Sequence, residues 1–225
     1  MDFNGKVFTT VIFLGAGASR GAIDHILLNQ KRIKPPLNGD FFKIADTYAR
    51  AEGKKSQAQQ RLNRLYNVFK SDLPMKGVPT MEEAFSLLYV AKDFPEIYKQ
   101  GKGPKPDAGV RQEILDFFNL LFPILSLLDE ENGGATGYDR LAGQLTNGDT
   151  IITLNYDTML DSALRRRGWN PRVGYGISGG ADKVSWPPLN VAQPLKVELL
   201  KLHGSMNWFV RGDISNLKKY FQVNP

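Results

Sequence analysis

The sequence of 225 residues has no cysteine and only two histidines, His25 and His203. The absence of cysteine excludes disulfides, thiolate nucleophiles and cysteine-ligated metal centres. Two histidines do not suffice for a multi-histidine metal site, so we expect no metal. Chemistry that needs an imidazole must use one of these two residues.

Long apolar runs are also lacking. The most apolar stretch, residues 117–128, is broken by Asn119, Pro123 and Ser126, whereas a membrane-spanning helix needs roughly 20 apolar residues. The first residues lack the basic segment and apolar core of a signal peptide. We therefore expect a cytoplasmic protein that does not enter the membrane.

The positive charge is unevenly distributed. The net charge is +6, yet residues 31–76 alone carry eleven lysines and arginines against four acidic residues. This excess reflects either solvated helix faces or a patch that attracts phosphates or nucleic acid. We favour solvated faces, and we expect nucleic acid to be bound only weakly or indirectly.

Three segments have the apolar, β-branched composition of buried strands: residues 7–14, 150–154 and 197–202. Helical patterns occupy residues 19–30, 40–52, 56–70, 80–92, 112–128 and 157–167. The helix at 80–92 opens with a capping box, Thr80 to Glu83, and the last helix stops at Gly168. A linker at 99–109 and a loop at 171–194 separate these elements.

This order of elements predicts an α/β fold. We expect a Rossmann-like open parallel sheet with a large helical insertion after the first strand. Residues 1–37 and 146–225 would form the Rossmann-like core, and residues 38–145 the helical insertion subdomain.

Each predicted strand runs into small or polar residues: GAGAS at 15–19, NYD at 155–157 and HGS at 203–205. In open α/β sheets, ligands bind at the carboxyl ends of the strands. If the three strands share a sheet, these motifs converge on one site.

The first motif, Gly15 to Ser19, predicts a tight turn between a strand and a helix. Backbone N–H groups at such a turn suit a pyrophosphate, and glycine permits its close approach. The dinucleotide fingerprint G-x-G-x-x-G fails because Arg20 stands in the last position, which disfavours a dehydrogenase. A tight turn that binds no ligand is the alternative.

The other two motifs carry side chains with chemical function. Asp157 either caps the following helix or acts in a site, and Asn155 is suited to hold a ribose hydroxyl or orient a water. His203 is either a general base near pH 7 or a structural histidine.

Taken in order, GAGAS, TLNYD and KLHGSMNW resemble the motifs of the sirtuin family. They are most similar to those of the divergent bacterial sirtuin-like NAD-hydrolase domains of anti-phage defence systems. The resemblance implies that Asn155, Asp157 and His203 are catalytic. It implies that NAD, as the substrate, is bound by Gly15, Ala16, Gly17, Ala18, Ser19, Gly204 and Ser205.

The sequence departs from the protein-deacylating sirtuins in three respects. It lacks their four-cysteine zinc module, it has Leu154 where they have glutamine, and Gly21 is followed by AIDHILLNQ rather than a Gly-Ile-Pro-Asp-Phe-Arg type segment. The family's sheet continues with another strand after the histidine motif. This chain stops at Pro225, so we expect the C-terminal part of the sheet to be missing from it.

The resemblance implies NAD glycohydrolysis to nicotinamide and ADP-ribose, as the NAD-depleting effector of an anti-phage system that acts by abortive infection. One alternative is a sensor that binds NAD or ADP-ribose without turnover. An NAD-dependent protein deacylase is a more distant alternative. As partners the resemblance implies a homo-oligomer, or a complex with a further domain or an activating protein.

Overall fold

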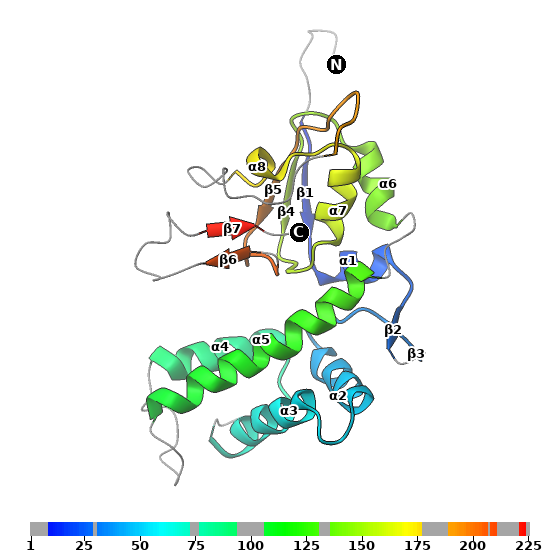
Figure 1. Cartoon of the computed structure of the whole chain (residues 1–225). Coiled ribbons are helices and arrows are strands. Elements are labelled where there is room, and N and C mark those ends of the chain that lie inside the picture. The colour runs from blue at the N-terminus through cyan, green and yellow to red at the C-terminus, as the bar shows by residue number, and fades with distance from the viewer. Residues whose placement is uncertain are drawn as a thin grey trace. The chain divides into compact units, whose positions relative to one another are not determined.

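A computed structural model describes residues 9–28, 31–72, 77–93, 106–130, 136–176, 189–206, 208–210 and 221–223 (Figure 1). The contacts between residues divide the chain into two compact units. The first unit combines Met1–Asp24 with Leu128–Pro225, and the second unit is His25–Leu127. The corresponding boundaries predicted from the sequence lie at 37/38 and 145/146.

The first unit contains a parallel sheet of β1 (Val11–Leu14), β4 (Thr150–Thr153) and β5 (Glu198–Lys201), with β4 in the middle. The three strands pair without stagger, so that Leu14, Thr153 and Lys201 lie level at their carboxyl ends. This confirms the prediction of an α/β fold with a parallel sheet built from these three segments.

The two faces of this sheet differ in burial. Ile151 and Leu199 are buried on one face, and Phe13, on the opposite face, is 71% exposed. Lys201 lies on the buried face and pairs with Asp161 of helix α7 (Met159–Arg166). Helix α7 therefore covers the buried face of the sheet.

Three further helices belong to the first unit: α1 (Ala16–Ala22), α6 (Gly137–Gln144) and α8 (Pro171–Gly174). Helix α6 packs against α1 and α7, and α8 packs against β5 (Figure 1). The capping box at the start of α6, in which Thr136 and Asp139 exchange hydrogen bonds, is a local signal for a helix that the sequence analysis missed.

The second unit is mainly helical. Its elements are the antiparallel pair β2 (Ile26–Leu28) and β3 (Lys31–Ile33), helices α2 (Phe41–Glu52), α3 (Gln57–Asn67), α4 (Met81–Asp93) and α5 (Pro106–Glu130, whose last residues belong to the first unit), and the π-helix η1 (Val68–Asp72). The rings of Phe41, Phe42, Phe69 and Phe117 are among those that form its core. The predicted capping box of α4 is present, since Thr80 and Glu83 bond one another.

The predicted helix at 19–30 is wrong. Helix α1 ends at Ala22, and Ile26–Leu28 forms strand β2 instead. Ile26 and Leu28 are buried and Leu27 is exposed, which is the alternation of a strand with one buried face. A short apolar run does not distinguish the two structures by periodicity alone.

The predicted linker needs correction, because helix α5 begins inside it, at Pro106. A strand that was not among the three predicted forms at Phe221–Val223. This strand, β7, pairs antiparallel with β6 (Trp208–Val210) and is separate from the parallel sheet. The predicted loop at 171–194 opens with α8, and residues 177–188 of it lie outside the described ranges.

Gly168 ends helix α7, as the sequence predicts. Its N–H donates to Arg165 O at 2.9 Å, and the N–H of Trp169 donates to Leu164 O at 3.1 Å. These two bonds define a Schellman motif, which requires a positive φ at the residue that follows the C-cap. Gly168 supplies this with φ +76°.

Substitution of Gly168 by alanine should destabilise the protein by about 2 kcal/mol or more in urea unfolding. The backbone there is left-handed, and a Cβ would lie 2.2 Å from Val191 Cγ2. As the control, Gly143→Ala adds a Cβ with no neighbour within 4 Å on helix α6, and it should raise stability by up to about 1 kcal/mol. Equal effects of the two changes would contradict this account of the turn.

Candidate functional site

The three predicted motifs meet at the carboxyl edge of the parallel sheet. Leu154 N–H donates to Leu14 O at 3.1 Å, and Leu202 N–H donates to Thr153 O at 3.0 Å. The ladder therefore continues for one bond beyond the strand ends. The residues that follow each strand are neighbours, which confirms that the motifs converge.

Ser19 joins the first two motifs. Its hydroxyl donates to Asp157 Oδ2 at 2.7 Å and lies 2.9 Å from the hydroxyl of Tyr138, which comes from helix α6. The side-chain amide of Asn155 donates to Ser19 Oγ at 2.8 Å and to Gly15 O at 3.0 Å. These contacts bring together segments that are more than 100 residues apart in sequence.

Which hydroxyl donates and which accepts in this cluster follows from the single proton that each hydroxyl carries. Ser19 has one hydroxyl proton, which goes to Asp157, so Tyr138 must donate to Ser19. The amide nitrogen of Asn155, which shares two protons among three acceptors, also lies 3.2 Å from Tyr138 Oη. The result is a chain from the phenol through the serine to the carboxylate, in which each bond strengthens the next.

Asp157 has a structural contact as well as its contact with Ser19. Its second oxygen, Oδ1, accepts from Met159 N–H, the first residue of helix α7, at 3.2 Å. The side chain therefore bonds both the start of helix α7, where Thr158 is the N-cap, and the cluster around Ser19. Asp157 is 5% exposed, and burial raises the pKa of its carboxyl, against the opposing effects of Lys201 and of the Ser19 hydrogen bond.

Tyr138 is held in its neutral form. Burial raises the pKa of its phenol, and the nearby charge of Asp157 adds to this rise. A neutral phenol remains a hydrogen-bond donor throughout the physiological range, so the chain of donors that ends at Asp157 is preserved.

His203 lies beside the second motif and is exposed. Its ring centroid lies 5.9 Å from that of Tyr156. The backbone carbonyl of Tyr156 accepts from Met206 N–H at 2.8 Å and from the Ser205 hydroxyl at 3.3 Å. Gly204, with φ +85°, makes the turn after His203. The third motif is thus fixed to the second through Tyr156, with the imidazole accessible to solvent.

The glycines of the first motif are not required by packing. Gly15 is the N-cap of α1, and Ala18 N–H donates to Gly15 O at 2.8 Å. A Cβ added to Gly15 or Gly17 would meet nothing within 4 Å, and neither has a positive φ. The turn is therefore open at both glycines among the described residues. Ala16 and Ala18, which are also predicted to bind NAD, belong to the same turn.

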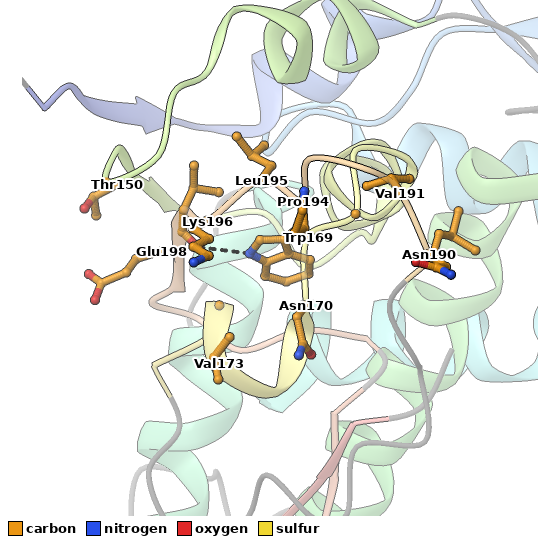
Figure 2. A pocket seen from close by; sticks show the side chains of 15 residues that line it. Thr150, Trp169, Asn170, Val173, Asn190, Val191, Pro194, Leu195, Lys196 and Glu198 are labelled. Carbon is orange, nitrogen blue, oxygen red and sulfur yellow. Dashed lines mark hydrogen bonds between the residues drawn. The ribbon is translucent and has the colours of Figure 1, made fainter.

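A cavity of about 760 Å³ lies elsewhere in the first unit (Figure 2). Thr150 and Glu198, the first residues of β4 and β5, line it, so it lies at the amino ends of the strands. Figure 2 shows Trp169 and Val173 among the apolar side chains around it. This cavity is at the opposite end of the strands from the polar cluster and contains none of the predicted site residues.

The basic segment is partly neutralised within the second unit. Arg64 donates to the buried carboxylate of Asp116 through two nitrogens, at 2.6 and 2.9 Å, and Arg61 lies 3.8 Å from the same group. Arg50 pairs with Asp46. These pairs favour the interpretation of this segment as ordinary helix faces.

The described part of the chain contains no cluster of three or more histidine or acidic side chains arranged to hold a metal ion. No helix there is long and apolar enough to cross a membrane.

Several residues of this site were not predicted from the sequence. Tyr138 is one, and its partner Ser19 is 119 positions away. Lys201 is another, and here a signal exists: it continues the alternation of the buried residues Val197 and Leu199, so a charged side chain falls on the buried face of the strand.

Compared with known proteins, the sequence matches no family model and none of the curated proteins. The sirtuin resemblance stays a prediction based on the three motifs.

Replacing Ser19 with alanine should lower the free energy of unfolding by about 1–3 kcal/mol, because it leaves buried donors and acceptors unpaired. Chemical denaturation measures this. Ser126→Ala is the matched control, since the bonds described for that hydroxyl go to carbonyls of its own helix. The control should change stability by no more than about 0.5 kcal/mol. Equal losses in the two variants would show that the contacts of Ser19 contribute no more to the free energy of unfolding than those of an ordinary helix serine.

Asp157→Asn should gain stability relative to the wild type as the pH rises from 4.5 to 7.5. A raised pKa in the folded state means that the wild type loses stability as the pH increases toward that pKa. The asparagine variant has no such loss. Urea unfolding at both pH values measures the difference.

Asp139→Asn provides the control. Burial opposes the change, but hydrogen bonds from Thr136 and Arg166 lower the pKa of Asp139 overall. The stabilisation from a lowered pKa is already complete above the ordinary carboxyl pKa of about 3.9, so the stability difference between this variant and the wild type should stay nearly constant from pH 4.5 to 7.5. An equal gain in both variants would refute the assignment for Asp157.

Proposed function

We propose that this protein is an NAD glycohydrolase with a Rossmann-like core, which converts NAD and water to nicotinamide, ADP-ribose and a proton. The observation that carries the proposal is the cluster in which Ser19 bonds both Asn155 and Asp157. The three side chains come from the two motifs that the sirtuin resemblance assigns to binding NAD and to catalysis.

The first step of the proposed reaction is binding of the pyrophosphate at the turn from Gly15 to Ser19. The open space above Gly15 and Gly17 supports this, because glycine without a packing or backbone reason is expected where a ligand approaches the main chain. A pyrophosphate held there limits the motion of the nicotinamide ribose.

The bond to be broken joins the nicotinamide nitrogen to ribose C1′, and its transition state resembles an oxocarbenium ion. Asn155 positions the ribose or the attacking water. Asp157 binds the carboxamide or supports Asn155 through Ser19. His203 accepts a proton from water or from a ribose hydroxyl, and its exposure leaves it accessible to both.

The wider function follows from the resemblance. We assign the chain to the NAD-depleting effectors of bacterial anti-phage defence, acting as a homo-oligomer or with a further domain or activating protein. The absence of cysteine argues against the zinc-bearing deacylase branch.

Incubation of the purified chain with NAD should release nicotinamide, measured by chromatography. His203→Ala and Asn155→Ala should each lower the rate by about 10²-fold or more, the scale of a lost general base. His25→Ala is the matched control, because it removes the chain's other histidine and should leave the rate unchanged.

Three outcomes would contradict the proposal. Wild-type turnover in both variants would refute the assigned roles. Binding of NAD without nicotinamide release would favour a sensor, and release that requires an acylated peptide would favour a deacylase. The thermal unfolding of Asn155→Ala is measured in parallel, because Asn155 is buried in the cluster.

A further inference from the structure

A buried ion pair lies directly beneath the site. Lys201 and Asp161 have side chains that are each 1% exposed, with Nζ 3.0 Å from Oδ2. The same ammonium donates to the backbone carbonyl of Asp157 at 2.5 Å. One cation therefore links the end of β5 to helix α7 and to the segment that contains Asp157.

The position of Asp161 is itself fixed. Its other oxygen accepts a hydrogen bond from the hydroxyl of Tyr175. The ring of Tyr175 stands edge-on to Trp169, with centroids 4.9 Å apart, and to Trp208, with centroids 5.3 Å apart. The carboxylate that holds Lys201 is thus anchored in a packed aromatic cluster.

Fold stability does not account for this pair. Taking two charges out of water costs several kcal/mol for each ion, and apolar residues of similar volume often replace a buried pair without loss of stability. An apolar pair would not, however, supply a donor to the carbonyl of Asp157. Placement of that segment is what the ammonium contributes.

We infer that Lys201 is a positioning residue of the proposed hydrolase. Its ammonium, oriented by Asp161, fixes the backbone at Asp157. It thereby sets the direction in which the carboxyl and the neighbouring amide of Asn155 face the substrate. This inference rests on the proposed function, although its structural part is testable without substrate.

The charge of Lys201 also acts on the Asp157 carboxyl. Burial raises the pKa of Asp157, and Lys201 is the largest influence that lowers it. The other titratable groups that face this carboxyl are Asp161 on α7, which raises its pKa, and the neutral phenol of Tyr138 on α6. Removal of Lys201 therefore raises the pKa of Asp157 further.

The test uses the double variant Lys201→Met/Asp161→Asn, which leaves no buried charge without its partner, alongside the single variant Lys201→Met. The carboxyl carbon of Asp157 is followed by NMR through a pH titration, with its resonance assigned from Asp157→Asn. We expect the titration midpoint to move to higher pH in both variants. We also expect kcat/KM for nicotinamide release to fall roughly ten- to hundredfold, with the acidic limb of its pH profile shifted upward.

Lys196→Met is the matched control: the same substitution at an exposed position shortly before β5. It should leave the titration and the kinetics unchanged. An unchanged Asp157 midpoint in both variants, folded as judged by thermal unfolding, would overturn the inference, since the double variant also removes the opposing effect of Asp161. A wild type that releases no nicotinamide would instead overturn the proposed function, and the titration would still decide the role of Lys201.

Discussion

The unstaggered pairing of three parallel strands is the constraint on which the rest of the structure depends. Because Leu14, Thr153 and Lys201 lie level, the residues that follow them emerge at one edge. A shift of one residue in β4 would turn Asn155 and Asp157 to the other face of the sheet. The cluster around Ser19 is therefore a consequence of strand register.

Burial then determines how the polar groups at this edge behave. Ser19 and Asp157 are almost fully buried, and a buried polar group without a partner is costly. The contacts among them satisfy this requirement with donors from four elements: α1, α6, the segment after β4 and α7. Each element gains a fixed position relative to the others, so the cluster supports the first unit at the same point where it orients the candidate site.

The sequence predicts the strands and the meeting of the motifs because apolar runs followed by small or polar residues are local signals. It does not predict the partners within the cluster. Tyr138 and Ser19 are brought together by the packing of α6 on α1, which no local pattern encodes. The misassigned helix at 19–30 has a local cause: Ile26 to Leu28 is too short for its periodicity to separate a strand from a helix.

The contrast in burial between Asp157 and His203 has a consequence for how this fold can change. Asp157 bonds the first residue of helix α7 and belongs to the cluster, so under the proposed mechanism a substitution there alters folding and chemistry together. The imidazole of His203 is exposed, and its described contact is with the ring of Tyr156, so the fold does not depend on it in the same way. Under the proposed mechanism, replacing His203 alone removes catalysis and leaves the fold and nucleotide binding intact. A single substitution therefore separates catalysis from recognition.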